Sequence, residues 1–159
     1  MTEVNVNIPE NTRPWQGIVL HHSFTADNKL LNNTNAITKH HKEVNGWLDN
    51  GYHFVIEYID NKPVIVPARP LNMRGAHTKE QEQNFYSIGI CIIGNYDKDL
   101  VSEETYAVLL ELLETLCRRF DLSTYNIKPH SFFAPYKSCP GHRFDLGRVI
   151  SELRSRLIK

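Results

Sequence analysis

The sequence lacks an excess of charge of either sign. Its 159 residues contain 18 Lys and Arg side chains against 18 Asp and Glu side chains, so the formal net charge is zero. Electrostatic capture of nucleic acid or of an anionic membrane surface depends on a basic excess, which this composition does not supply. We therefore expect no nucleic-acid partner.

Long apolar runs are also missing. No stretch approaches the ~20 apolar residues that a membrane-spanning helix requires, so we expect no membrane insertion. The first fourteen residues, MTEVNVNIPENTRP, have neither the basic start nor the apolar centre of a signal peptide. We expect an extended polar arm over residues 1–14 and synthesis in the cytoplasm without a signal peptide.

Cysteine is scarce, with only three in the chain. An odd number of widely spaced cysteines is a poor disulfide framework. Cys91 lies in an apolar run and Cys117 in a helical pattern, which favours buried, inert thiols. Cys139 differs, because it stands in the polar, Pro- and Gly-containing loop segment KSCPG.

Strand and helix patterns alternate along the rest of the chain. The patterns predict strands over residues 17–22, 52–59, 64–66 and 87–93, and helices over residues 32–44, from about 103 to 120, and after residue 145. Ser102 and Asp145 are the expected N-caps, and Asp60–Asn61 the expected tight turn between two strands. Interleaved strands and helices predict an α/β fold: a three-layer sandwich with a central mixed β-sheet flanked by helices. The length predicts one domain, over residues 15–159.

Histidine is abundant, with eight residues, and one of them, His130, combines with Cys139 into half of a metal site. His130 and Cys139 share one loop, and imidazole nitrogen and thiolate sulfur are ligands that zinc prefers. A catalytic zinc takes three protein ligands, and either His21 or His22, at the end of the first strand, is the best third donor. Neighbouring strand residues point to opposite faces, so only one of the two can serve. The alternative is a structural zinc with four ligands, in which His142 takes part.

Four segments carry a resemblance to a known family. They are IVLHHSFT, HHKEVNGWLDNGYHFVIE, SIGICIIGNYD, and APYKSCPG followed by FDL. In this order they resemble the N-acetylmuramoyl-L-alanine amidase type 2 family of zinc amidases, which includes small phage endolysins and peptidoglycan recognition proteins. The likeness covers about residues 15–150.

The resemblance implies a role for several residues. His21, His130 and Cys139 match the ligands of one Zn²⁺ per chain, although one residue more than the family commonly has separates His130 from Cys139. Tyr52 matches a tyrosine beside the metal, and Lys137 matches the active-site lysine of the phage type. The implied substrate-binding residues are His77, together with Trp47 and Asn84 as walls of a groove.

The implied reaction is hydrolysis of the amide bond between N-acetylmuramic acid and L-alanine of the peptidoglycan stem peptide. Zinc would polarise the carbonyl and activate water, while Lys137 and Tyr52 stabilise the oxyanion. We expect a monomeric phage or prophage endolysin that reaches the bacterial cell wall after release. The alternatives are a non-catalytic peptidoglycan-binding module, which typically lacks the cysteine, and a cell-wall recycling amidase. Binding to an RNA polymerase, known for some phage amidases of this type, is a further possibility that the sequence does not test.

Overall fold

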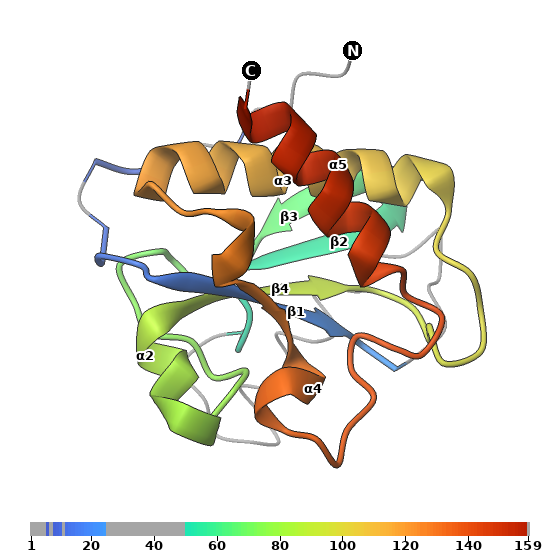
Figure 1. Ribbon diagram of the computed structural model, residues 1–159, viewed down its shortest axis with the longest axis horizontal. Helices are drawn as coiled ribbons and strands as arrows, with labels where there is room; N and C mark the ends of the chain where they lie inside the picture. The colour runs from blue at the N-terminus through green and yellow to red at the C-terminus, as the bar shows by residue number, and fades with distance from the viewer. Residues whose placement is uncertain (1–5, 7, 11, 25–49, 159) are drawn as a thin grey trace.

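The computed structural model describes residues 6, 8–10, 12–24 and 50–158 (Figure 1). The helix predicted over residues 32–44 and the side chain of Trp47 lie outside the described residues, as does part of the predicted N-terminal arm. Among the described helices, none is both long enough and apolar enough to cross a membrane.

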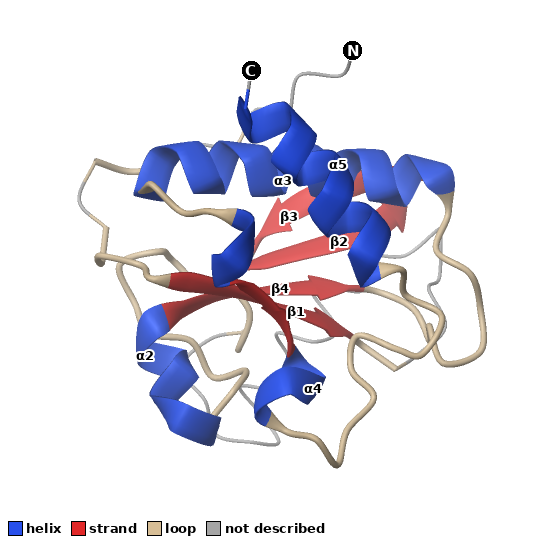
Figure 2. Cartoon of the chain, in the orientation of Figure 1, coloured by secondary structure: helices blue, strands red, loops and turns tan. Residues whose placement is uncertain are grey.

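A five-stranded mixed sheet forms the centre of the described structure (Figure 2). Its strands are β1 (Gly17–His22), β2 (Phe54–Ile59), β3 (Lys62–Pro67), β4 (Ser87–Ile92) and β5 (Ile127–Pro129). Their order across the sheet is β3-β2-β4-β1-β5. Strand β1 runs parallel to β4 and β5, β2 runs parallel to β4, and only the β2–β3 pair is antiparallel.

The two most apolar runs of the sequence form β1 and β4, which are neighbours in the sheet. Every residue of β1 and of β4 is buried. A strand that is apolar over nearly its whole length suits a position covered on both faces, and β4 indeed lies in the middle of the strand order. The hairpin between β2 and β3 turns at Asp60 and Asn61, whose φ angles are 52° and 64°. Positive φ at both turn residues matches the twist of the flanking strands, as the dipeptide predicted.

Two long helices cover one face of this sheet. Helices α3 (Glu103–Phe120) and α5 (Leu146–Ile158) lie on the same side in Figure 1. Ser102 caps α3 by accepting a hydrogen bond from the Thr105 N–H, and the Asp145 carboxylate accepts one from the Arg148 N–H at the start of α5. Both predicted caps are confirmed. The helices bury a row of leucines against the sheet, including Leu109, Leu112, Leu113, Leu116 and Leu153.

Short helical segments complete the described part of the fold. They are the 3₁₀ turns η1 (Glu80–Glu82) and η2 (Thr124–Asn126) and the one-turn helices α2 (Gln83–Tyr86) and α4 (His130–Phe133). Figure 1 shows α2 and α4 across the sheet from α3 and α5. The prediction of an α/β sandwich with a mixed central sheet and flanking helices is therefore confirmed. Cys91 and Cys117 are buried and free, also as predicted.

The carboxyl ends of the parallel strands form one edge of the sheet, and candidate functional residues lie at this edge. The parallel strands β1, β2 and β4 point their carboxyl ends the same way. In open α/β sheets this edge is where ligands bind. Strand β1 ends there with His21 and His22, and the chain enters α4 at His130 directly after β5, the fourth parallel strand.

Candidate metal centre

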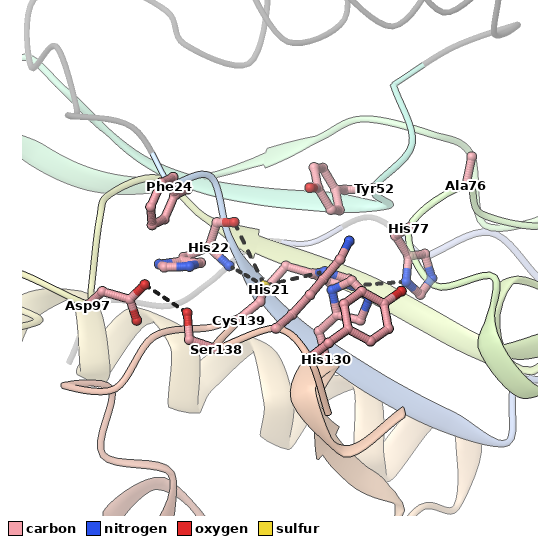
Figure 3. Close-up of a pocket in the computed structure, with 12 residues that line it drawn as sticks. His21, His22, Phe24, Tyr52, Ala76, His77, Asp97, His130, Ser138 and Cys139 are labelled. Atoms are coloured by element: carbon pink, nitrogen blue, oxygen red, sulfur yellow. Dashed lines mark hydrogen bonds between the residues drawn. The ribbon is translucent and has the colours of Figure 1, made fainter. Parts of the chain in front are cut away.

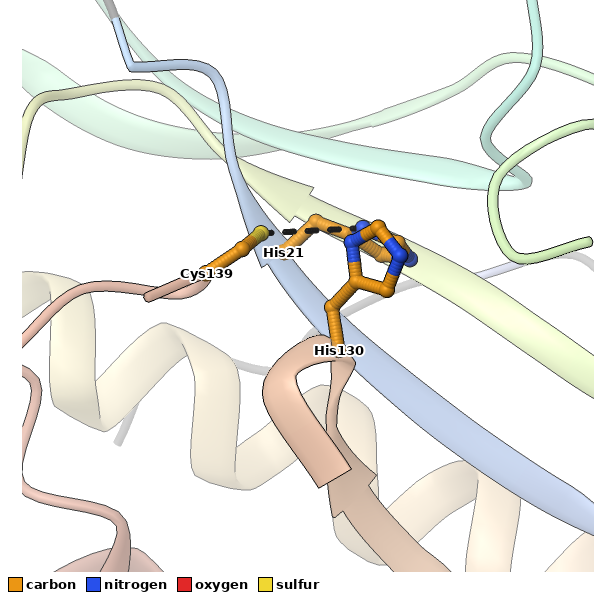
Figure 4. Close-up of side chains that lie close together, drawn as sticks. All are labelled: His21, His130 and Cys139. Atoms are coloured by element: carbon orange, nitrogen blue, oxygen red, sulfur yellow. Dashed lines mark hydrogen bonds between the residues drawn. The ribbon is translucent and has the colours of Figure 1, made fainter. Parts of the chain in front are cut away.

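Three side chains from distant parts of the chain converge at this edge (Figure 4). His21 comes from β1, His130 is the first residue of α4, and Cys139 lies on the loop that follows α4. One donor atom from each lies within 4.8 Å of the other two, and Cys139 Sγ is 3.7 Å from His21 Nδ1. Two imidazoles and one thiol form the donor set of a catalytic zinc site that leaves a position open, so the residues fit the metal that the sequence predicted.

The structure distinguishes His21 from the other candidate ligands, His22 and His142. His22 points elsewhere, because its Nδ1 accepts a hydrogen bond from the Tyr96 N–H at 3.1 Å. His142 has an exposed side chain 3.9 Å from Asp97 and is not part of the cluster. Among the described residues, the alternative of a structural zinc with four ligands that include His142 is therefore wrong.

The loop that carries Cys139 is anchored at several points. Asp97 accepts hydrogen bonds from the Ser138 hydroxyl at 2.7 Å and from the His142 N–H at 2.9 Å. The Ser131 N–H donates to the Cys139 carbonyl at 2.9 Å, which ties the loop back to α4. Gly141 has a φ of 118°, and a Cβ on it would come within 2.4 Å of the Tyr96 backbone. Only glycine fits this close passage of the two loops.

The backbone also contacts the sulfur itself. The His22 N–H lies 3.3 Å from Cys139 Sγ, in position to donate a hydrogen bond to it. Such a donor stabilises the anionic form of the sulfur, which is the form that binds a metal. His22 therefore contributes to the centre through its main chain, not through its imidazole.

Burial controls the protonation of the three candidate ligands. It lowers the pKa of His21 well below the ordinary value, with a smaller lowering from His77 and His130. Burial likewise lowers the pKa of His130 to about 4 and raises the pKa of the Cys139 thiol to about 11. Both imidazoles are thus neutral near pH 7, which leaves a nitrogen lone pair on each ring for a metal.

A cavity of about 540 Å³ opens over the three donors (Figure 3). Its lining includes Tyr52 and Lys137, for which the family resemblance implies catalytic roles, as well as His77. The sequence-predicted site residues within the described part of the chain therefore gather around one cavity, with the exception of Asn84.

Tyr52 lies just before β2 and not within it. Its N–H donates to the Asn50 side-chain oxygen at 2.9 Å, so a turn replaces the two strand residues predicted here. Its ring lies 5.1 Å from the His21 ring, centroid to centroid. Burial raises the pKa of the Tyr52 hydroxyl well above its ordinary value, and the thiols of Cys91 and Cys139 add to the increase. The hydroxyl is therefore a permanent hydrogen-bond donor near pH 7.

Lys137 lines the cavity with an exposed side chain, two residues before Cys139. Its ammonium lies 5.8 Å from the ring centroid of Tyr136, which also lines the cavity. The Tyr136 hydroxyl donates to Glu80 at 2.9 Å and so joins the loop after α4 to η1. Lys137 thus places a positive charge at the cavity on the side of the Cys139 loop.

His77 contacts His21 directly, and Asn84 contacts the loop that carries His77. His77 Nδ1 lies 3.0 Å from His21 Nε2. The Asn84 side-chain oxygen accepts hydrogen bonds from the N–H groups of His77 and Thr78, at 2.7 and 2.8 Å. Asn84 shapes the loop that carries His77, and its predicted contact with substrate stays a prediction.

Sequence reasoning missed three residues of this centre. Asp97 holds the Cys139 loop, Thr78 contacts His21, and Tyr136 lines the cavity. Each is a single polar or aromatic residue in a loop, where no periodic pattern marks it. The only available signal was position, since Asp97 follows the end of a central strand and Tyr136 stands beside Lys137.

Comparison with known proteins identifies the family. The family model described as N-acetylmuramoyl-L-alanine amidase matches residues 11–142, which is most of the chain. The chain belongs to this family. It is also 32% identical over 138 residues to the endolysin of Enterobacteria phage T3, an alignment that covers 84% of this chain and 83% of the endolysin.

Other members of the amidase family show the same likeness. The peptidoglycan-recognition protein SC1a of Drosophila melanogaster is 30% identical over 127 residues, covering 77% of this chain and 66% of that protein. The solved structure of the N-acetylmuramoyl-L-alanine amidase LysC from Clostridium intestinale URNW superposes with a TM-score of 0.73 at 26% identity. It covers 89% of this chain and 86% of that one. Family membership supports peptidoglycan as the ligand class, by cleavage or by binding.

Proposed function

We propose that this chain is a zinc-dependent N-acetylmuramoyl-L-alanine amidase. In this proposal residues 15–159 form one catalytic domain that hydrolyses the bond between N-acetylmuramic acid and L-alanine in peptidoglycan. The observation that carries the proposal is the convergence of His21, His130 and Cys139 on the floor of an open cavity lined by Tyr52 and Lys137. A module that only binds peptidoglycan has no need of a three-donor metal centre with an open position.

The residues around the cavity have separate tasks. His21, His130 and Cys139 would hold the zinc ion, which when bound supplies Lewis acidity toward the scissile carbonyl and toward water. The Tyr52 hydroxyl, held protonated, donates a hydrogen bond to the oxygen that becomes negative as the amide carbon turns tetrahedral. Lys137 contributes a positive charge to the same oxygen.

The decisive experiment removes the sulfur ligand. We expect Cys139→Ser to lose bound zinc in elemental analysis and to stop the release of soluble stem peptides from purified sacculi. The matched control is Cys117→Ser, which alters a buried cysteine within α3 and should retain zinc. Full activity of the Cys139 variant would contradict both the ligand assignment and the proposed reaction.

Two further assays separate the competing roles. A protein that only binds peptidoglycan would sediment with sacculi but release nothing from them. A recycling amidase would cleave soluble anhydro-muropeptides in preference to intact sacculi, whereas the proposed phage-type endolysin cleaves the intact wall. The proposal includes action on the wall after release from the cytoplasm, by a monomer. Co-purification with an RNA polymerase would add a regulatory role that no feature of the described structure requires.

A further inference from the structure

The imidazole of His77 fits tightly into its surroundings. A Cβ atom placed on Gly75 or on Gly89 would come within 2.4 Å of the His77 ring carbon Cδ2. Only residues without a side chain can therefore flank this ring. The main chain that carries it is fixed as well, through the two hydrogen bonds to the Asn84 oxygen. The orientation of the ring is thus imposed from both sides.

The partners of His77 determine which of its nitrogens carries the proton. Nε2 lies 3.0 Å from the carbonyl oxygen of Ser87, and a carbonyl oxygen can only accept. In the neutral ring Nε2 must therefore be the protonated nitrogen. Nδ1 is left with a lone pair and acts as an acceptor.

This acceptor faces His21. The distance from His77 Nδ1 to His21 Nε2 is 3.0 Å, so a proton on His21 Nε2 completes a hydrogen bond. If neutral His21 instead carried its proton on Nδ1, the lone pairs of His21 Nε2 and His77 Nδ1 would face each other at 3.0 Å. The Thr78 hydroxyl lies 2.9 Å from His77 Nδ1 and 3.2 Å from His21 Nε2, and supports the same contact from the side.

The consequence appears at the opposite nitrogen of His21. With the proton on Nε2, Nδ1 is unprotonated, and Nδ1 is the atom 3.7 Å from Cys139 Sγ. A chain of contacts therefore runs from the Ser87 carbonyl through His77 to His21 and ends with a lone pair directed into the three-donor cluster.

We propose that His77 is a positioning residue that selects the tautomer of His21 and aims its Nδ1 at the metal. The inference rests on the proposed zinc function and assigns His77 a role other than the groove contact that the family resemblance implied. Both ring nitrogens of His77 have partners within the protein, so its imidazole serves His21. Partners that orient a ligating histidine are typically worth about 10- to 100-fold in metal affinity.

The test compares two substitutions of His77 and reads the tautomer directly. In zinc-free wild-type protein at pH 7, two-bond ¹H–¹⁵N NMR correlations should show the proton on Nε2 of both His21 and His77. In His77→Leu the acceptor is gone, so a fraction of His21 should shift its proton to Nδ1, and zinc affinity in a chelator competition should fall about 10- to 100-fold. In His77→Asn the side-chain oxygen replaces Nδ1 as acceptor and should restore the His21 tautomer and most of the affinity.

A matched control separates positioning from general stability. His53 is another buried histidine of the same region, hydrogen-bonded to the Met73 carbonyl and to the Gly89 N–H. His53→Asn should lower the thermal midpoint without changing the tautomer of His21 or reducing zinc affinity more than twofold.

Three outcomes would overturn the inference. They are a wild-type His21 protonated on Nδ1, a zinc affinity of His77→Leu within twofold of wild type, or an equal loss of affinity in His53→Asn. The wild-type measurement needs no variant to fold. If wild-type protein released nothing from sacculi, the proposed amidase function would fail, while the tautomer and affinity results would still decide the role of His77.

Discussion

At the residue scale, Tyr52 illustrates how burial prepares a group for one task. Its hydroxyl is protonated near pH 7, and desolvation raises its pKa further, so it can donate but does not become an anion beside the sulfur of Cys139. We predict that Tyr52→Phe retains zinc and loses about 100-fold in turnover on sacculi, the usual scale for one oxyanion donor. Tyr125→Phe, at an exposed tyrosine on η2, is the control and should match wild type. Equal rates for both variants would remove Tyr52 from the mechanism.

Lys137 gives a second prediction at this scale. The exposed side chain of Lys137 reaches the cavity from the Cys139 loop. Its proposed role requires only the positive charge of the ammonium group. Lys137→Met keeps the length of the side chain and removes the charge, so we expect retained zinc and a turnover reduced by about 100-fold or more. The same change at Lys98, an exposed residue next to the Asp97 loop, provides the comparison. An active Lys137→Met enzyme would leave the oxyanion to Tyr52 and the metal.

The identity of the donors could be read from the sequence, but their environment could not. His130 and Cys139 stood out because imidazole and thiol are uncommon together in one loop, and strand alternation reduced His21 and His22 to a choice of one. The contact between His77 and His21 joins residues 56 positions apart, through a slot between two glycines. No local pattern encodes such a contact, and family resemblance gave His77 a different role.

At the scale of elements, prediction succeeded where a segment was long or uniform. Helix α3 has eighteen residues with a repeating apolar face, and β4 is apolar after its first residue, Ser87, so both patterns were clear. Strand β5 has three residues and α4 has four, which is too short for any period to show. These two elements nevertheless place His130, so the sequence pattern singled out this residue as a candidate ligand without predicting the segment that carries it.

The hydrogen bonds between Asp97 and the loop that carries Cys139 lead to a prediction about stability and pH. Hydrogen bonds from Ser138 and from the His142 N–H hold the pKa of Asp97 below its usual value. A lowered pKa means that the folded protein favours the carboxylate, so this stabilisation is complete above about pH 4 and is lost as pH falls further, through the folded pKa. We predict that zinc-free Asp97→Asn is less stable than wild type at pH 7, and that the difference shrinks below pH 4 in urea titrations.

The neighbouring Asp99 is exposed and provides the matched control, Asp99→Asn. Asp97→Asn should also bind zinc more weakly, because the loop that presents Cys139 loses a charged anchor, whereas Asp99→Asn should not. A stability difference between wild type and Asp97→Asn that stays constant down to pH 3 would show that the carboxylate charge does not hold the loop.

At the scale of the whole molecule, buried neutral histidines make stability depend on pH. His53 is hydrogen-bonded at both nitrogens, and burial lowers its pKa to about 4. The unfolded chain takes up this proton near pH 6.5, whereas the folded chain does so only near pH 4, so stability is lost as pH falls through that window. From His53 alone we expect a loss of about 2 kcal/mol between pH 7.5 and pH 5.

The measurement is urea unfolding of zinc-free protein at the two pH values. In His53→Asn the decrease between pH 7.5 and pH 5 should be smaller than in wild type by about 2 kcal/mol, although the variant is less stable overall. His142→Asn changes an exposed histidine and should leave the decrease as it is in wild type. A His53→Asn protein with the wild-type pH dependence would show that His53 does not remain neutral in the fold.

The sequence of β3, one of the two edge strands of the sheet, has a consequence for self-association. Strand β3 reads KPVIVP, and Pro63 and Pro67 stand an even number of residues apart, so their main chains face the same side. Proline has no N–H and is tolerated in a sheet where that side is the open edge. Of the three residues facing outward, only Ile65 then offers a donor to an approaching strand. A concentrated solution of this protein should therefore resist edge-to-edge fibril growth along β3, and Pro63→Val with Pro67→Val would remove that protection.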